Sequence, residues 1–553
     1  MIKVRSENGF TIIIFLALLL MLTLAGINAV MTSTTEVDIA GNEMNYNKVF
    51  YAAESGLEKA AAEIEQSYKT TAQPPDPLPS GTFTVNEDGY DGASASIDVT
   101  YSTTQLGAAH QKNLTNGAYR GLYALATEYE VNSTGMTTNS QNRADLKMIV
   151  ESDLIPLFQF AVFYEPRLEI APGPPMTLGG RVHSNGDLYI QSGNSLTINS
   201  QMTAAGNIYH GRYSGSGQSG ANGDVFIMDN FGNPVSMYQS GNWVDAYDDD
   251  WVENSLSLWG GRVEDGNHGI TELNLPVVRS GDPIDMIKTA GESADSYERK
   301  ATLKIVGGQA YQVNVDGSET NITANLVSLG VISYSSFHDG RENKNVNSLD
   351  IDIGALNSSG YWPRNGIIYT AESQGSSTLE ATRLVNGSVL NGGLTVCTKN
   401  PLYIQGDYNS VSKKPAAVMT DAMTILSNSW NDGDGTIGIH DGNRKASETT
   451  VNVSYVTGNV ASGGGSYSGG FENLPRFLEN WSNVEFKWRG SAIDLWESME
   501  AIGQWSYGSY YTAPNRNWEF DTDLLDPTKL PPGTPVISVI QKVGWREIIA
   551  SQY

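Results

Sequence analysis

The sequence predicts a mainly β protein with one long N-terminal transmembrane α-helix, and three observations support this fold class. Residues 10–31 are almost wholly apolar. The 553 residues include 58 glycines, and short apolar runs closed by Gly, Asn or Asp recur along most of the chain, as is typical of many short strands separated by turns. The formal net charge of -27 repels phosphate backbones, so we expect no nucleic-acid partner.

The apolar segment Phe10–Met31 is long enough to cross a membrane. At about 1.5 Å per residue it reaches roughly 33 Å, and a bilayer core is about 30 Å thick. Lys3 and Arg5 precede it, whereas Glu36 and Asp38 follow it, which predicts a cytoplasmic N-terminus and an extracytoplasmic body. We expect a single-pass protein of the inner (cytoplasmic) membrane, because a cleaved secretory signal has a shorter apolar core of about 7–15 residues.

The helix is predicted to continue beyond the membrane. Apolar residues recur mostly three or four positions apart from Val37 to Ile64, and the segment ESGLEKAAAEIE (residues 54–65) has strong helix propensity. Prolines in TAQPPDPLPS (residues 71–80) cannot continue a helix. One helix is therefore expected over residues 10–72, with its first half in lipid and its second half in water.

The first 70 residues resemble those of type IV prepilins. A short charged leader, residues 1–9, ends in Gly9, and Phe10 opens the membrane helix. The stretch IAGNEMNYNKVFYAAESGLEKAAAEIE (residues 39–65) is similar to PilX-type minor pilins, which carry Ala-Gly-Asn and Ala-Ala-Glu-x-Gly-Leu patterns here. The resemblance implies that a prepilin peptidase cuts between Gly9 and Phe10, and that the chain assembles with other pilin subunits.

Ile14 departs from the pattern of major pilins. Most of them carry Glu as the fifth residue of the mature chain, where the carboxylate is thought to pair with the N-terminal amine of a neighbouring subunit. Here the fifth position after the predicted cut is Ile14, and a lone amine would be costly in lipid. This departure favours a minor or tip subunit, or a protein that never enters a fibre.

Residues 81–160 alternate apolar and polar positions between turn signals, and predict an antiparallel sheet. A sheet that follows a long helix is the usual arrangement of a pilin head. We therefore expect a pilin-like α+β module formed by this sheet and the helix.

A repeat predicts a different architecture for residues 161–460. The segments RVHSNGDLYI (from Arg181) and QMTAAGNIYH (from Gln201) align without gaps at an offset of twenty. Short strands repeated at this period favour a β-solenoid, similar to a parallel β-helix, with loops inserted between its rungs. A β-sandwich is the alternative for this body. Residues 461–553 are rich in aromatics, for which packing is the favoured role, and are expected to cap the solenoid.

Motifs for catalysis are absent from the sequence. It has no nucleophile elbow, P-loop, HExxH or paired CxxC, and its one cysteine, Cys397, lies in an apolar run typical of a buried thiol. The segment NDGDGTIG (residues 431–438) resembles the start of a calcium loop, with Asp432 and Asp434 as candidate ligands. The twelfth position of that loop holds Gly442 instead of Glu, so a solvated acidic turn is the alternative. No other cofactor is expected.

These features together predict a non-enzymatic, minor pilin-like protein of a type IV pilus or related filament. It would be inserted in the membrane before assembly and would present a large β-rich head at the cell surface or on the pilus. The alternative is a membrane-anchored adhesin that binds surface glycans through solenoid loops or C-terminal aromatics. A polysaccharide-degrading enzyme is the least favoured function, because no pair of carboxylates is marked by the sequence.

Overall fold

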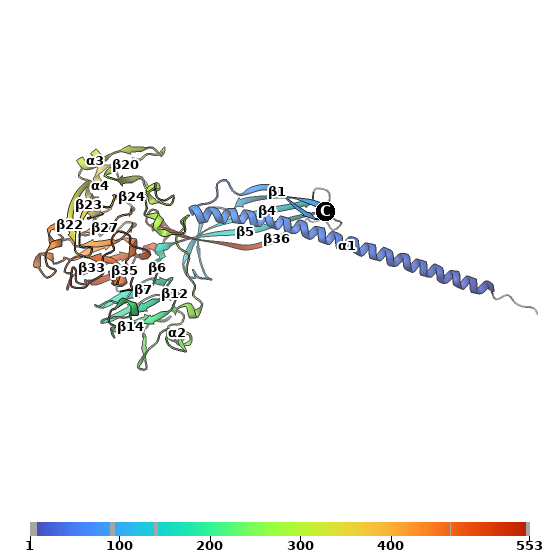
Figure 1. The fold of residues 1–553 in the computed structure, drawn as a ribbon, viewed down its shortest axis with the longest axis horizontal. Helices are drawn as coiled ribbons and strands as arrows, with labels where there is room; N and C mark the ends of the chain where they lie inside the picture. Colours follow the sequence, from blue (N-terminus) through green and yellow to red (C-terminus); the bar gives the residue numbers. More distant parts are fainter. Residues whose placement is uncertain (1–7, 89–93, 138–141, 376, 465, 549–553) are drawn as a thin grey trace, which may run out of the picture.

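A computed structural model describes residues 8–88, 94–137, 142–375, 377–464 and 466–548. Its longest element is helix α1 (Asn8–Thr71), of 64 residues, which corresponds to about 96 Å. Figure 1 shows that the first half of α1 projects from the molecule, whereas its second half lies along a sheet. The predicted leader residues Lys3 and Arg5 lie outside the described residues.

The second half of α1 packs on an antiparallel sheet, as the sequence predicts. The strands of this pilin-like module pair in the order β1-β2-β4-β5-β36, with β3 beside β4. Their bounds are β1 (Ser80–Asp88), β2 (Ser94–Gln105), β3 (His110–Asn113), β4 (Tyr123–Thr137), β5 (Arg143–Pro156) and β36 (Val536–Glu547). The core between helix and sheet contains Val49, Leu57, Ile64 and Tyr68 of α1, which follow one another at spacings of eight, seven and four positions and therefore share one helix face.

The rest of the chain is a parallel β-solenoid inserted between β5 and β36. Its longest sheet runs in the order β18-β12-β9-β6-β34-β31-β28-β26-β24-β19-β20-β21. These strands are β6 (Phe160–Tyr164), β9 (Arg181–Ser184), β12 (Met202–Ala204), β18 (Val263–Glu264), β19 (Leu303–Val306), β20 (Gln309–Val313), β21 (Glu319–Asn321), β24 (Ile367–Ala371), β26 (Leu394–Thr398), β28 (Ala416–Thr420), β31 (Ser454–Asn459) and β34 (Ala492–Glu497).

The solenoid has two further faces besides the long sheet. One face holds β22 (Ile332–Asp339), β23 (Lys344–Asp352), β25 (Thr378–Val385), β27 (Leu402–Gln405), β29 (Met423–Leu426) and β32 (Pro475–Phe477), together with β7 (Leu168–Ile170), β10 (Leu188–Ile190) and β13 (Ile208–His210). The other face holds β8 (Met176–Leu178), β11 (Ser195–Ile198), β14 (Asp224–Met228) and β15 (Pro234–Ser236), together with β30 (Thr449–Asn452), β33 (Glu485–Gly490) and β35 (Asn515–Phe520).

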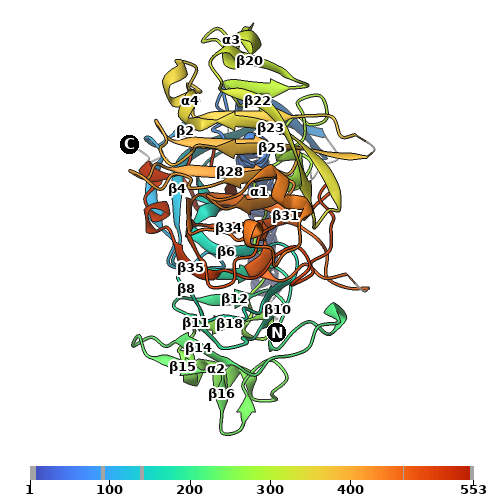
Figure 2. The ribbon, with the colours of Figure 1, turned by 90° about the vertical axis from the view of Figure 1, so that its left-hand side faces the viewer.

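Short peripheral elements project from this body. They are the hairpin of β16 (Tyr238–Gln239) and β17 (Asn242–Trp243), and the helices α2 (Trp251–Trp259), α3 (Thr323–Ser328) and α4 (Ile353–Ser359). In Figure 2, which looks toward the head, α3 and α2 lie at opposite ends of the solenoid.

The register confirms the predicted repeat. Leu188 pairs with Ile208, and Met202 pairs with Val182, in parallel strands twenty residues apart. Stacking of successive segments in parallel register is the pattern of a solenoid and not of an antiparallel β-sandwich. Both halves of the solenoid bury their apolar side chains in one continuous interior.

The chain enters and leaves the solenoid at its middle. It begins at β6 and winds through β9 and β12 to β18 at one end of the stack. Residues 265–302 then cross to the opposite end, and the chain winds back from β19 to β34, which pairs with β6. We call the contact between β34, the last strand of the returning half, and β6, the first strand, the seam. The crossover packs Leu273, Val278 and Ile284 against the outer face of the long sheet.

The C-terminal residues depart from the predicted cap. Strands β33, β34 and β35 are rungs in the interior of the stack, and β36 leaves the solenoid to pair with β5, Val536 lying opposite Pro156. The alternating pattern of residues 536–547 marks a strand but carries no information on its partner, since sequence order does not fix spatial order in a sheet. The predicted packing role of the aromatics is confirmed for Trp481, Trp488, Trp496 and Trp518, which are all buried.

Candidate functional site

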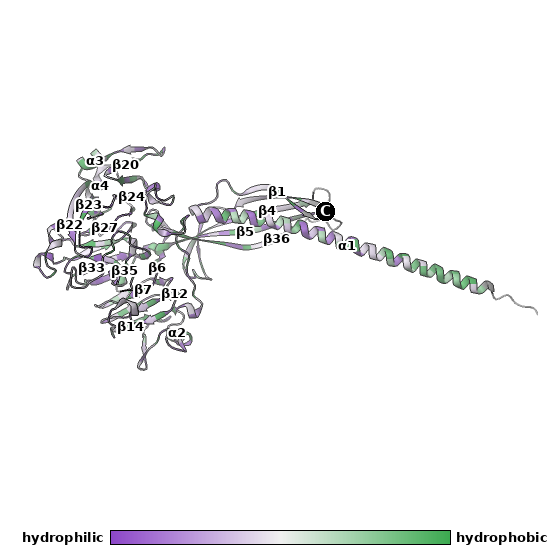
Figure 3. Cartoon of the chain, in the orientation of Figure 1, coloured by the Kyte–Doolittle hydropathy of each residue, from purple (hydrophilic) through white to green (hydrophobic). Residues whose placement is uncertain are grey.

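The first half of α1 is an apolar surface that nothing in the structure covers. Large side chains between Phe10 and Met31 are exposed, and no part of the most apolar window of the helix is buried in the described structure. Figure 3 shows the apolar colouring along this projecting arm. A continuous apolar surface of this length requires lipid or other apolar helices around it.

Two threonine side chains in this half of α1 bond within the helix. Thr23 Oγ1 donates to the carbonyl oxygen of Leu19 at 2.7 Å, and Thr35 Oγ1 donates to that of Met31 at 2.8 Å. Bonds to the preceding turn remove free donors from the helix surface. The arm therefore suits an environment without water, where unpaired polar groups are expensive.

Ile14 lies on this arm with 45% of its surface exposed. The first charged residue after it in the sequence is Glu36, so the apolar arm carries no carboxylate of its own that could pair with an amine. Gly9 lies in the first turn of α1, next to Phe10. The cut between Gly9 and Phe10 and the significance of Ile14 stay predictions.

The second half of α1 is held firmly to the module. A Cβ added at Gly135 of β4 would lie 2.6 Å from the carbonyl oxygen of Val49, and one at Gly56 would lie 2.3 Å from Ser133 Oγ. Side chains of β36 also reach the helix, because Lys542 pairs with Glu58 and Tyr46 donates to Glu547. Such close approach anchors the projecting arm to the sheet and, through β5 and β36, to the solenoid.

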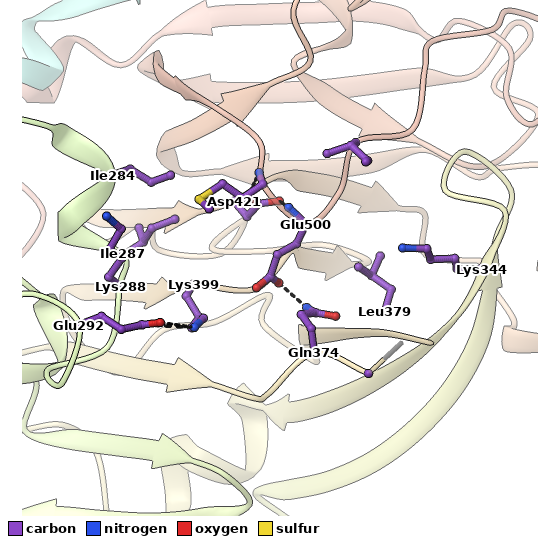
Figure 4. A pocket seen from close by; sticks show the side chains of 13 residues that line it. Ile284, Ile287, Lys288, Glu292, Lys344, Gln374, Leu379, Lys399, Asp421 and Glu500 are labelled. Carbon is purple, nitrogen blue, oxygen red and sulfur yellow. Dashed lines mark hydrogen bonds and ion pairs between the residues drawn. The ribbon is translucent and has the colours of Figure 1, made fainter. Parts of the chain in front are cut away.

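A cavity of about 390 Å³ opens on the head between the crossover and the loop that follows β34 (Figure 4). Glu500 at its floor accepts hydrogen bonds from the side-chain amides of Gln374 and Asn400. Burial, and secondarily the neighbouring Asp421, raises the pKa of Glu500 to about 7. Asp421 itself accepts backbone N–H bonds from Met499, Glu500 and Ala501.

The polar side chains of this cavity are largely committed to one another. Lys399 Nζ lies 3.0 Å from Glu292, and Lys288 Nζ lies 2.6 Å from Asp285. The arrangement therefore stabilises the junction of crossover and solenoid. Sequence reasoning missed this cluster because its members come from five separate segments, and no local motif links them.

The predicted calcium ligands are engaged elsewhere. Asp432 pairs with the Arg383 guanidinium at 2.6 Å, and Arg383 also binds Asp350. Asp434 accepts from the backbone N–H of Asn431 at 3.2 Å. Over the described residues, no group of three or more His, Cys, Asp or Glu side chains is placed to hold a metal ion. The calcium site stays a prediction, and the positive charge of Arg383 beside Asp432 argues against it.

The thiol of Cys397 is fully buried on β26. Burial raises its pKa, which disfavours the thiolate that a nucleophile requires. The position agrees with the packing role that the sequence predicts for this residue.

Comparison with known proteins shows a family resemblance in the N-terminal segment. Residues 8–58 match the model of the PilX N-terminal family. Among solved structures, the competence-associated pilin ComZ from Thermus thermophilus matches with 11% identity over 91% of this chain and 97% of that chain. Its TM-score is 0.23, so this likeness carries no argument about the fold. No curated protein matches the sequence. Residues 8–58 of the chain therefore form a pilin-like, PilX-type N-terminal segment.

Proposed function

We propose that this chain is a minor pilin that is carried at the tip of a type IV pilus or a related filament. The observation that carries the proposal is the division of α1 into an exposed apolar arm and a half that is docked on the sheet. The arm would hold the chain in the inner membrane and then pack among the helices of other pilin subunits. The module and solenoid would form an extracytoplasmic head with a structural role, not a catalytic one.

The shape of the head supports a terminal position. The solenoid crosses the axis of α1 at the end opposite the N-terminus (Figures 1 and 2). Its longest sheet, at about 4.8 Å between strands, extends roughly 50 Å. In a stack of staggered subunits, a body of this size would occupy the space of the next subunit above. A subunit at the tip has no such neighbour.

Ile14 also supports a position at the tip of the filament. A repeating subunit gains from a carboxylate that pairs with the amine of its neighbour, and this arm has none. A tip subunit needs no carboxylate of its own for a subunit above it. Without that requirement, an apolar side chain at the fifth mature position costs nothing in lipid.

Mass spectrometry of the membrane-extracted chain tests the processing step. We expect a mature chain that begins at Phe10, cut by a prepilin peptidase after Gly9 while the helix is retained. An N-terminus at Met1, or a cut beyond Met31, would exclude the pilin pathway. Gly9→Val serves as the matched variant, because it changes the predicted cut site and leaves the apolar arm intact.

The substitution Ile14→Glu tests the tip position. If the missing carboxylate restricts the chain to the tip, Ile14→Glu should raise the number of copies per filament, as measured by quantitative immunoblotting of sheared filaments. Ile13→Glu is the matched control, because it introduces the same charge one position away. An equal copy number for wild type and Ile14→Glu would remove Ile14 from the explanation.

A further inference from the structure

The seam between β34 and β6 contains a buried carboxyl group on the inside of the solenoid. Asp494 of β34 lies opposite Tyr164 of β6 on one side and opposite Thr457 of β31 on the other. The same row of the long sheet holds threonine on the four preceding rungs, namely Thr370, Thr398, Thr420 and Thr457. The row therefore changes from a hydroxyl to a carboxyl group at the seam.

The backbone also changes at this position. The pairing of β31 with β34 shifts by one residue directly after Asp494, so that Gly458 lies opposite Trp496. A bulge of this kind redirects the side chains that follow it. Trp496 and Asp494 consequently line one cavity at the seam, of about 280 Å³, together with Tyr164, Arg167 and Asn459.

Several polar atoms around this seam cavity are buried without a hydrogen bond. Across the residues that the structure describes, no partner is found for Asp494 Oδ1 and Oδ2, Trp496 Nε1, Arg167 Nε and Tyr164 Oη. Asp494 is 1% exposed. The Asn459 side chain and the backbone N–H of Trp496 lie near its carboxyl group without forming a bond of normal geometry. Buried polar groups are normally paired, so this concentration in one cavity needs an explanation.

The cavity of Figure 4 provides the contrast. There Glu500 accepts two side-chain amide bonds, and Asp421 accepts three backbone bonds. Those groups satisfy one another, whereas no partner is found within the described residues for the corresponding groups of the seam cavity. Leaving them unpaired is costly for the fold.

The unpaired groups define the chemistry of that ligand. Trp496 Nε1 and Arg167 Nε are donors, whereas the Asp494 carboxyl group offers acceptors, so the ligand must supply both donors and acceptors. The guanidinium of Arg167 disfavours a cation, and Glu497 disfavours an anion. Burial raises the pKa of Asp494 well above its usual range, so its carboxyl group favours the neutral form. The volume is just below that of pockets for drug-sized ligands, about 300–1,000 Å³. These properties fit a small, neutral, polyhydroxylated ring.

We propose that the seam cavity binds one ring of a neutral saccharide, with Asp494 accepting from its hydroxyl groups and Trp496 and Arg167 donating to them. The Arg167 guanidinium packs on Tyr213, whose ring centre lies 3.5 Å from the guanidinium carbon. Tyr213 in turn contacts Tyr189, at 5.8 Å between ring centres. This aromatic support keeps the donor oriented before a ligand arrives.

Saturation-transfer NMR on the full chain tests the site, in a detergent without a sugar head group. The probes are the methyl glycosides of glucose, galactose, mannose and N-acetylglucosamine. We expect transfer to at least one of them, and binding at least about tenfold weaker in Asp494→Asn, a loss of about 1.4 kcal/mol. Glu500→Gln, in the cavity of Figure 4, is the matched control and should bind as the wild type does.

Arg167→Gln keeps the test decisive if Asp494→Asn does not fold, because Arg167 is only half-buried. It should also weaken binding and leave the thermal midpoint within a few degrees of the wild type. Absence of transfer to all four glycosides would mean that water alone fills the cavity and would overturn the proposal. Binding that survives both substitutions, or tighter binding of glucosamine or galacturonate, would also overturn it.

The proposal goes beyond the filament role. Binding is measured on the purified chain, so a negative result would leave the processing and tip tests untouched. A filament position other than the tip would equally leave the seam cavity unchanged.

Discussion

The pilin-like module and the solenoid bury their sheets in different ways. In the module, one face of an antiparallel sheet packs on α1 through an almost wholly apolar core. In the solenoid, the central strands of the long sheet are buried on both faces, by the interior on one side and by the crossover and module on the other. The module therefore holds the helix mainly through apolar packing, whereas the solenoid also buries polar side chains between its stacked rungs.

The charged side chains show the same contrast. Lys542 and Glu58, which connect β36 to α1 in the module, are both about half exposed, and exposed pairs of this kind contribute little to stability. In the solenoid, Arg476 and Glu342 pair at 2.7 Å with almost no exposure. Breaking a buried pair is expensive, so we infer that such pairs specify the arrangement of the rungs.

The largest expected effect is the loss of a core side chain in the module. Leu57→Ala should lower the free energy of unfolding of the module by about 2–5 kcal/mol, because it leaves a cavity between α1 and the sheet. Hydrogen exchange with mass spectrometry should detect faster exchange in β4 and β5, with unchanged protection in β26 and β28. The exposed Tyr51→Ala is the control. Equal loss of protection in the solenoid would show that the two regions unfold as one unit.

A smaller effect is expected from crowding two rungs of the solenoid. A Cβ at Gly490 would lie 2.1 Å from the carbonyl oxygen of Val453 on the neighbouring rung, so Gly490→Ala should destabilise the solenoid by about 1–3 kcal/mol. Gly438→Ala adds the same methyl group where no atom lies within 4 Å. Thermal unfolding of both variants measures the difference. Equal midpoints would refute the close contact between these rungs.

The smallest of these effects is a pH dependence that belongs to the solenoid. Burial raises the pKa of Glu479 to about 7, against the hydrogen bonds from Ser427 that lower it. The folded state therefore holds this proton more tightly than the unfolded chain, whose carboxyl group titrates near 4.5. The stabilisation is complete below pH 4.5 and is lost as the pH rises through about 7.

Glu479→Gln should remove this contribution. The wild type should lose roughly 1–3 kcal/mol of stability from Glu479 between pH 5 and pH 8, and the variant should show a flatter profile in denaturant titrations at each pH. Gln keeps one of the two acceptors that Glu479 offers Ser427, and its amide can donate to Ser427 Oγ, without a titrating group. A wild-type profile that rises over this range, or one that the substitution leaves unchanged, would contradict the assignment.

Local patterns in the sequence predicted most of the architecture. The apolar run from Phe10, the helical spacing up to Ile64 and the offset of twenty between Val182 and Met202 each depend on residues close in the chain. The structure contains all three, as helix α1 and as the parallel register of β9 and β12. Periodicity predicts such elements because neighbouring residues share one face of a helix or one row of a solenoid.

The pairing of strands that are distant in the chain could not be predicted from the sequence. Nothing in residues 536–547 identifies β5 as their partner, and nothing in Asp494 identifies Tyr164, since these contacts depend on where the crossover returns the chain. The candidate sites differ in the same way. The exposed arm was predicted from one segment, whereas the two head cavities are assembled from residues more than a hundred positions apart.

The location of the head on purified filaments tests the central claim most directly. An epitope inserted at the exposed turn of Val315, which lies in the hairpin of β20 and β21, can be labelled with antibody-coated gold and counted by electron microscopy. We expect gold at filament ends only, with at most one labelled end per filament. Gold distributed along the shafts, or filaments without label while the membrane fraction retains the chain, would contradict a tip pilin.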